Sequence, residues 1–217
     1  MTILIIYSII YIGLFSLTEW LYHQQKITVE HTRKMVHVAT GFIALSFPIF
    51  ITALWQMLVL CGSFLLLMSL CEKMNWLKSI TSVKRKSYGS WLFALIVFVC
   101  YFIQQQLGSP LYFYLPILIL SICDPVAAII GKRFNYQARS VFGQTKTIGG
   151  SIAFFVSSLI ILCGFYFQYQ NALLYLPLFA LSVTLLEFFS TKGWDNLTIP
   201  LGVVANIFIV SNIITII

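Results

Sequence analysis

Charged residues are scarce in this sequence of 217 residues, and their scarcity excludes the commonest class of protein. Only 9% of the residues are charged, whereas 60% are hydrophobic. A soluble globular domain has about 25% charged residues. The composition therefore excludes a soluble domain and indicates an all-α, polytopic integral membrane protein.

Several motifs that mark other classes of protein are also absent. The sequence contains no G-x-x-x-x-G-K-[ST] loop of the kind that binds nucleotides in P-loop proteins. The five cysteines have no metal-ligand spacing, so we expect reduced packing residues. Residues 1–22 lack a positively charged start and a small-residue cleavage site, which predicts a retained helix. Because no repeat or linker is visible, we expect residues 1–217 to form one transmembrane domain.

Long apolar runs recur along the chain at the length that a bilayer requires. A membrane helix needs a run of about 20 apolar residues, and this criterion predicts about eight spans. They lie near residues 2–22, 35–51, 54–71, 88–106, 110–131, 149–168, 171–190 and 197–217.

The basic residues alternate with these runs in a way that predicts orientation. All 13 of them fall in the gaps after the first, third, fifth and seventh spans. Basic loops stay in the cytoplasm, so these gaps are expected to be cytoplasmic and both termini outside. The net charge of +7 then belongs to the cytoplasmic face, where it suits anionic headgroups or a soluble anionic substrate, and is not a nucleic-acid signal.

One carboxylate lies inside an apolar run, where it needs an explanation. Asp124 is in the fifth run and is followed by Pro125. Aspartate caps helices and proline favours their first position, so we expect the fifth span to be broken there. Ala127, Ala128 and Gly131 would give the new helix a face without bulk, open to a ligand or another backbone. The structural alternative is that Asp124 caps a kink and pairs with a lysine.

Other polar residues fall at or just below the same predicted membrane surface. Arg33, His37 and Gly41 recur every four residues and therefore share one helix face. Each polar residue alone could be an interfacial anchor, but together they predict a shallow layer open to the cytoplasm. A transporter would be expected to place such groups nearer the midplane. The layer comprises Glu19, Arg33, His37, Gly41, Asp124, Glu187, Asp195 and Asn196.

The loop expected over residues 131–150 has the composition of an anion-binding segment. Lysine and arginine neutralise phosphate, and glycine lets backbone N–H groups approach it. Its "KTIGGS" stretch, residues 146–151, begins a helix, and a helix N-terminus favours anions. Together with carboxylates able to hold Mg²⁺, the layer suits a nucleoside triphosphate. The basic residues of the loop are Lys132, Arg133, Arg139 and Lys146, and its glycines after Gly131 are Gly143, Gly149 and Gly150.

A second cytoplasmic segment, residues 72–87, combines lysines with regularly spaced apolar residues. Trp76 or Leu77, Ile80 and Val83 fall on one helical face. We therefore predict a short helix lying on the inner leaflet.

Four blocks of the sequence, in this order, resemble the CTP-dependent lipid-alcohol kinases: phytol kinase, dolichol kinase and the yeast-type diacylglycerol kinase. The blocks are "RKMVH" at residues 33–37, "DPVAAIIGKRF" from Asp124, "KTIGGS" at residues 146–151, and Glu187 followed by "GWDNLTIP". The resemblance covers roughly residues 30–205. Two positions depart from the family pattern: Cys123 replaces a frequent glycine, and Gly149 replaces a frequent acidic residue.

The resemblance implies transfer of the γ-phosphoryl group of CTP to the hydroxyl of a membrane lipid alcohol, with Mg²⁺ as cofactor. Asp124 and Asp195, with Glu187, would hold the metal. His37 or one of the two aspartates would accept the hydroxyl proton, and Lys146 would act on the reacting phosphate. The remaining nucleotide and phosphate contacts would come from Arg33, Lys34, Lys132, Arg133, Arg139, Thr147, Gly149, Gly150, Ser151 and Asn196.

Two other functions remain open at this point. A phosphatidate cytidylyltransferase would share the CTP layer but would keep the CMP part on the lipid. A transporter of an anionic or phosphorylated solute would also need a basic cytoplasmic vestibule. The sequence determines neither the alcohol nor the oligomeric state.

Overall fold

The computed structural model describes residues 1–217 except 25–26, 75, 82–87, 135, 142–143 and 217. Most of the described residues are helical, as the apolar runs predict. The elements are α1 (Thr2–Gln24), α2 (Val29–Leu45), α3 (Phe47–Phe50), α4 (Leu54–Met74), α5 (Lys78–Thr81), α6 (Gly89–Leu107), α7 (Leu111–Phe134), β1 (Ala138–Val141), β2 (Gln144–Thr147), α8 (Ile148–Tyr166), α9 (Gln170–Leu173), α10 (Leu176–Phe189) and α11 (Asp195–Ile216).

The long helices follow the predicted spans, and the all-α membrane class is confirmed. By length and composition α1, α4, α6, α7 and α8 can each cross a membrane. The shorter α2 and α10, together with α11, occupy the other predicted spans, so the total of eight stays a prediction. Helix α2 begins at Val29, before the predicted start of the second span near residue 35, and its first turns include Glu30, Arg33 and Lys34.

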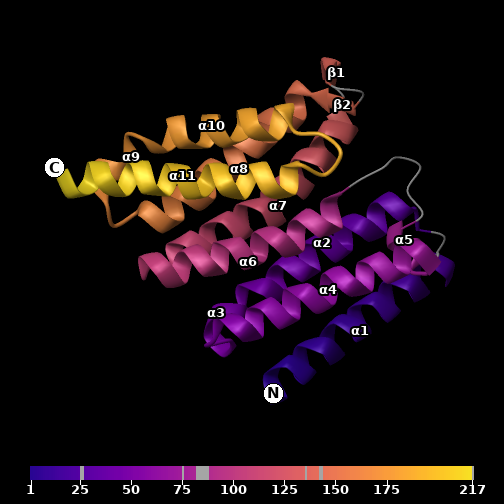
Figure 1. The fold of residues 1–217 in the computed structure, drawn as a ribbon. Coiled ribbons are helices and arrows are strands. Elements are labelled where there is room, and N and C mark those ends of the chain that lie inside the picture. The colour runs from indigo at the N-terminus through magenta and orange to yellow at the C-terminus, as the bar shows by residue number, and fades with distance from the viewer. Residues whose placement is uncertain (25–26, 75, 82–87, 135, 142–143, 217) are drawn as a thin grey trace.

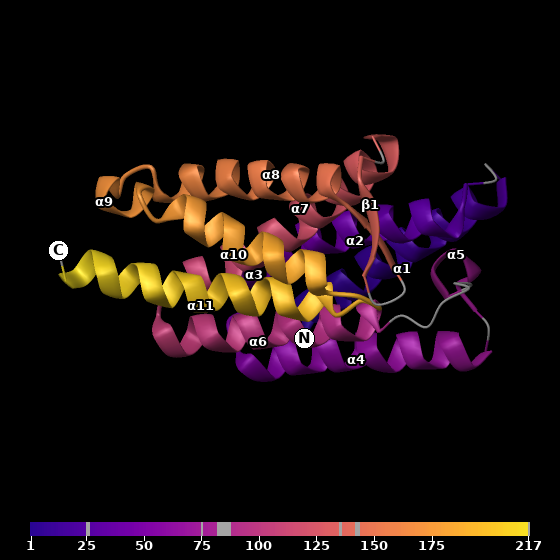
Figure 2. The ribbon, with the colours of Figure 1, turned by 90° about the horizontal axis from the view of Figure 1, so that it is seen from above.

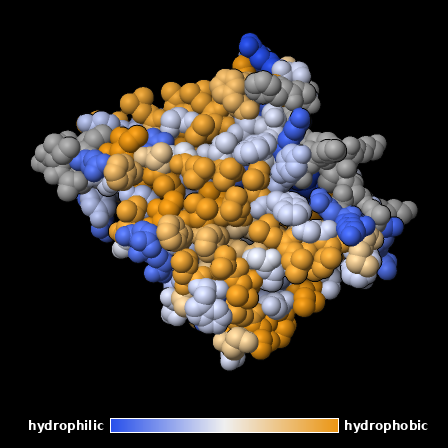
Figure 3. Space-filling view, in the orientation of Figure 1, coloured by the Kyte–Doolittle hydropathy of each residue, from blue (hydrophilic) through white to orange (hydrophobic). Residues whose placement is uncertain are grey.

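The two ends of the bundle differ in their connections. Figures 1 and 2 show α1 beginning and α11 ending at the left-hand ends of the helices, where α3 and α9 also lie. The right-hand ends bear α5, the β1–β2 hairpin and the turn between α10 and α11. Apolar side chains cover the middle of the face in Figure 3, and hydrophilic ones gather towards its edges, as expected of a membrane-embedded bundle.

Helix α7 is the centre of the fold, and it packs against α2, α6, α8 and α11. Its side chains Phe113, Leu115, Ile117, Ile119 and Leu120 are fully buried. This central position explains why the four blocks of the sequence converge, since α7 carries one block and its neighbours α2, α8 and α11 carry parts of the other three.

The predicted break at Asp124–Pro125 does not occur, because α7 continues through Pro125 to Phe134. Pro125 has no N–H for the Ser121 carbonyl, and such a loss is tolerated where neighbouring helices supply replacement hydrogen bonds. One residue before Ser121, the Leu120 carbonyl lies 3.3 Å from His37 Nε2 on α2, which ties this turn of α7 to its neighbour. Packing on several sides therefore keeps the helix intact, and Asp124 is an internal residue of it.

The basic loop predicted over residues 131–150 is partly a two-stranded hairpin. Strands β1 and β2 are antiparallel, with Ala138 opposite Thr147 and Val141 opposite Gln144. This small sheet connects α7 directly to α8, and it is the exception to the all-α prediction.

The predicted helix in residues 72–87 forms over α5, but its apolar side faces protein. Ile80 is buried in a cluster with Phe15, Val36 and Met68. The backbone N–H of Ser79 donates to Glu19 Oε2 at 3.0 Å, which ties α5 to α1. Val83 lies outside the described residues. Over 78–81 the segment thus packs on the end of the bundle, and its contact with the inner leaflet stays a prediction.

Candidate active site

A polar cavity of about 140 Å³ lies where α2, α6, α7 and the start of α11 meet. Apolar side chains of α1 and α4, together with Ile80 of α5, close its other sides. Six residues predicted from the sequence line it: Arg33, Lys34, His37, Asp124, Asp195 and Asn196. Positions more than 160 residues apart in the chain, which we placed in one polar layer from the sequence, therefore line one cavity.

Helix α2 presents its polar residues to this cavity through regular spacing and one close contact. Residues three or four positions apart share a helix face, so Arg33 and His37 point the same way. One turn further on, Gly41 lies against α7: a Cβ built there would be 1.8 Å from Ser121 Oγ. Glycine thus lets the two helices approach closely enough for the ring of His37 to reach the Leu120 carbonyl.

The contacts of His37 determine which ring nitrogen can accept a proton. Its Nε2 lies 3.3 Å from the Leu120 carbonyl oxygen. A carbonyl only accepts hydrogen bonds, so Nε2 carries the hydrogen and Nδ1 keeps its lone pair. The ring also packs edge-on against Phe93, with ring centroids 5.4 Å apart. His37 is therefore held in one orientation, with one basic nitrogen available.

A sharp turn positions Asp195 and Asn196 on the opposite wall. Lys192 and Gly193 have φ angles of 58° and 90°, and Gly193 adopts this conformation without strain. Asn196 Nδ2 donates to the Gly89 carbonyl at 2.7 Å, which fixes the turn to the start of α6. Asp195 is the first residue of α11, where the helix dipole favours a negative charge.

The two aspartates fit a metal ion that arrives with phosphate ligands. Asp124 and Asp195 line the same cavity and interact electrostatically. In the described part of the chain, no group of three His, Cys, Asp or Glu side chains is arranged to hold a metal. Mg²⁺ commonly takes one or two carboxylates and completes its shell with water and substrate phosphates. The donor set therefore suits Mg²⁺ bound together with a nucleotide better than a permanent metal site.

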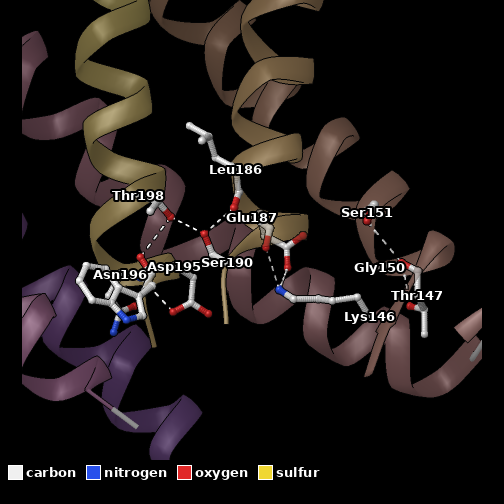
Figure 4. A network of polar contacts seen from close by, with 11 residues as sticks. Lys146, Thr147, Gly150, Ser151, Leu186, Glu187, Ser190, Asp195, Asn196 and Thr198 are labelled. Carbon is white, nitrogen blue, oxygen red and sulfur yellow. Dashed lines mark hydrogen bonds and ion pairs between the residues drawn. The ribbon is translucent and has the colours of Figure 1, made fainter. Parts of the chain in front are cut away.

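Lys146 and Glu187, predicted to act on phosphate and metal, instead form an ion pair with each other (Figure 4). The Lys146 amine donates to the Glu187 carboxylate and, at 2.9 Å, to the Glu187 backbone carbonyl. The side chains are only 15% and 6% exposed. Neither lines the polar cavity, although both interact electrostatically with Asp124.

The "KTIGGS" block packs two helices together. Thr147 caps α8 by accepting a hydrogen bond from the Gly150 N–H at 3.0 Å. A Cβ on Gly150 would come within 2.9 Å of the Ala127 carbonyl, and one on Gly131 within 2.6 Å of Thr147 Oγ1. The small-residue face of α7 thus receives another backbone, which was one of the two alternatives. Gly149 and Ser151 lie in the same first turn of α8, outside the cavity lining.

The other predicted phosphate ligands lie at the surface, outside the polar cavity. Lys132 and Arg133 end α7, and Lys132 Nζ is 2.6 Å from Glu30 Oε1. Arg139 is exposed on β1. In this structure they are peripheral charges on the same end of the bundle as the cavity.

The structure also adds residues that the motifs missed. Glu30 and Ser90 line the cavity, and neither belongs to the four sequence blocks. Glu30 had a usable signal, since it lies three residues before Arg33 and seven before His37 on the same helix face. Ser90 had none, because a serine near a helix start is commonplace.

Comparison with known proteins gives one long match. The chain is 30% identical over 203 residues to phytol kinase of Synechocystis sp., a match that covers 88% of this chain and 84% of the relative. It is 37% identical over 89 residues to an uncharacterised protein of Rickettsia prowazekii, covering 39% of this chain and 42% of that protein. No protein-family model and no solved structure matches the chain.

Proposed function

Because this chain belongs to the lipid-alcohol kinase family that includes phytol kinase, we propose that it transfers the γ-phosphoryl group of CTP to a membrane lipid alcohol of the phytol, polyprenol or dolichol type. The products are a lipid phosphate and CDP. The observation that best supports this reaction is the polar cavity, in which three carboxylates, two basic residues and a histidine meet at one end of an apolar bundle.

The transfer makes and breaks one bond each at phosphorus. The lipid hydroxyl oxygen forms the new bond to the γ-phosphorus as the bond to the β-phosphate oxygen breaks, and CDP leaves with that electron pair. Such reactions depend chiefly on positioning and on neutralising charge. Arg33 and Lys34 supply positive charge for the phosphate oxygens, and Asn196 supports the wall that bears Asp195.

The hydroxyl proton needs an acceptor, and His37 Nδ1 is the group that we assign. Its Nε2 is engaged with Leu120, so Nδ1 is the nitrogen that can take a proton. Asp195 and Arg33 both interact with His37 electrostatically. The carboxylate of Asp195 would stabilise the imidazolium that forms after the transfer.

Asp124 and Asp195 would hold Mg²⁺, which neutralises the β- and γ-phosphates when bound. In this proposal Lys146 and Glu187 act differently from their sequence-based assignment. Their ion pair fixes a positive and a negative charge close to Asp124, and thereby supports the site without touching the substrate.

The size of the cavity suggests which parts of the substrates enter it. Pockets for small molecules measure about 300–1,000 Å³, whereas this one measures about 140 Å³. It suits the reacting phosphates and the hydroxyl, with the base and ribose of the nucleotide outside. Since CTP is cytosolic, the proposal requires the cavity end of the bundle to be cytoplasmic, which the distribution of Lys and Arg predicts.

Transfer of labelled phosphate tests the proposal directly. Purified protein is incubated with Mg²⁺, a panel of lipid alcohols and CTP labelled at the α- or the γ-phosphate. We expect γ-label, and no α-label, in the lipid. Transfer of α-label to phosphatidate would identify a cytidylyltransferase instead, and an unlabelled lipid would overturn the kinase. If ATP served as phosphoryl donor equally well, the assignment of CTP would be overturned, but the kinase activity would stand.

A further inference from the structure

A second space, a groove of about 700 Å³, lies between α2 and α7 next to the polar cavity. Most of its wall is apolar, formed by Met35, Val38, Ala39, Pro125 and Ile129. The Ile129 and Met35 side chains are 58% and 46% exposed, so the groove opens to the surroundings of the bundle. We call this space the lipid groove.

The lipid groove runs from the polar end of the bundle towards membrane depth. Helices α2 and α7 are antiparallel here, since Glu30 near the start of α2 pairs with Lys132 near the end of α7. From Glu30 to Ala39 an α-helix rises about 14 Å. Beyond Ala39 the close contact of Gly41 with Ser121 brings the helices together and closes the groove.

The groove and the polar cavity are neighbours that share part of their walls. Glu30 and Lys34 line both spaces. On α7 the division falls between consecutive residues, because Asp124 lines the cavity and Pro125 lines the groove. A molecule with its tail in the groove would bring its end group to Lys34 and Asp124.

We propose that the lipid groove binds the hydrocarbon tail of the lipid alcohol and so delivers its hydroxyl to the polar cavity. This inference rests on the proposed function. One end group in a polar cavity and one long apolar chain beside it match a primary alcohol with a single tail. The segregation of the walls, charged at one end and apolar along the rest, matches the same molecule.

The groove positions the tail more than it attracts it. Lipid tails are as apolar as the groove walls, so transfer from the bilayer gains little hydrophobic free energy. Holding the tail instead fixes the place of the hydroxyl, and small misplacements of a reacting group cost up to about 100-fold in rate. The Glu30–Lys132 pair at the charged end does not lock the groove, because exposed ion pairs contribute about 0–1 kcal/mol.

Filling the groove tests this role. Ile129→Trp and Ala39→Trp place an indole in the groove, and Ile160→Trp on α8, where the side chain is 67% exposed, is the matched control. We expect the two groove variants to lower kcat/KM for a long isoprenoid alcohol by about tenfold or more. With a short-chain alcohol that does not reach the groove, the two groove variants should have the same kcat/KM as the control. Their KM for CTP should also equal that of the control.

A labelling experiment separates failure of the groove from failure of the kinase. A long-chain alcohol with a diazirine in its tail is photolysed with wild-type protein in nanodiscs, and the labelled peptides are mapped. Labelling of 35–39 and 125–129 that excess unlabelled alcohol removes supports the groove, even where no phosphate is transferred. Uniform labelling of all lipid-facing helices would overturn the role of the groove but not the kinase activity. Equal kinetics of Ile129→Trp and Ile160→Trp in an active enzyme would have the same meaning. A cross-link between two copies at residue 129 would assign the groove to a dimer contact and also overturn it.

Discussion

Two groups of polar residues at the same end of the bundle, the polar cavity and a junction at the hairpin, use the same kinds of residue in opposite ways. In the polar cavity, side chains from α2, α7 and α11 surround a space. At the hairpin junction, formed by Lys146, Thr147, Gly150 and Glu187, the polar groups bond to one another (Figure 4). The first arrangement leaves chemistry available for a ligand, whereas the second stabilises the place where β2, α8 and α10 meet.

The difference shows what a motif means in a membrane protein. A polar group in an apolar environment costs free energy unless it has a partner. In the hairpin junction that partner is another side chain or the backbone, so the structure is complete without a ligand. In the polar cavity, the carboxyl groups of Asp124 and Asp195 share one space, and a cation there would stabilise the ionised form of both.

Removing the charge at the centre of the cavity is expected to have the largest effect. Asp124→Asn keeps the shape of the side chain but removes a proposed metal ligand. We expect kcat to fall by about 10³-fold or more, because metal coordination supplies several kcal/mol of charge stabilisation. The assay measures transfer of γ-label to lipid, with melting in detergent recorded alongside.

The control for this variant is Glu72→Gln, a similar change at an exposed position of α4. It should keep wild-type kcat. Full activity in Asp124→Asn would mean that Asp124 only serves the structure of α7, and would contradict its place in the proposed site.

Breaking the hairpin junction should affect stability more than chemistry. Lys146→Ala leaves the Glu187 carboxylate buried without its partner. Loss of one member of a buried pair costs about 3–5 kcal/mol, so the melting temperature should fall clearly. The double variant Lys146→Met with Glu187→Met removes both charges and should recover most of the loss. A stable Lys146→Ala protein with a much higher KM for CTP would instead make Lys146 a phosphate ligand.

The sequence allowed the cavity to be predicted better than the junction, for a physical reason. Spacing along a single helix places Arg33 and His37 on one face, and an apolar run makes Asp124 conspicuous. The pairing of Lys146 with Glu187 depends on the hairpin and on how α10 packs, neither of which a local pattern contains.

The prediction of a helix break at Pro125 was wrong for a similar reason, since it too relied on a local pattern. Local preference favours a helix start at an Asp-Pro step. The structure overrides that preference because α7 is packed against four other helices, α2, α6, α8 and α11. Gly150 likewise suggested phosphate binding, yet it is needed where α7 and α8 touch, as is Gly131.

Replacing the proposed base should have a smaller effect than replacing Asp124. His37→Gln keeps a donor for the Leu120 carbonyl but has no basic nitrogen. General-base catalysis contributes about 10²–10⁴-fold, and the lower end applies where water can take over. We expect kcat to fall about 100-fold with KM for CTP little changed. His23→Gln on α1 is the matched control, and its kinetics should stay those of the wild type. Equal kinetics of the two variants would exclude His37 as the base.

The smallest effect is expected from replacing Lys132, which, like Lys146, was predicted from the sequence to be a phosphate ligand. Lys132 pairs with Glu30 at 2.6 Å, but the two side chains are 55% and 50% exposed. Water screens such a pair, so Lys132→Ala should cost about 1 kcal/mol or less. Because Lys132 does not line the polar cavity, KM for CTP and kcat should stay within about threefold of wild type, a change of less than 1 kcal/mol. The same substitution at Lys146 is the matched comparison: one lysine is buried and paired, the other exposed and paired. A tenfold rise in KM for CTP with Lys132→Ala would show that the nucleotide extends beyond the cavity to the end of α7.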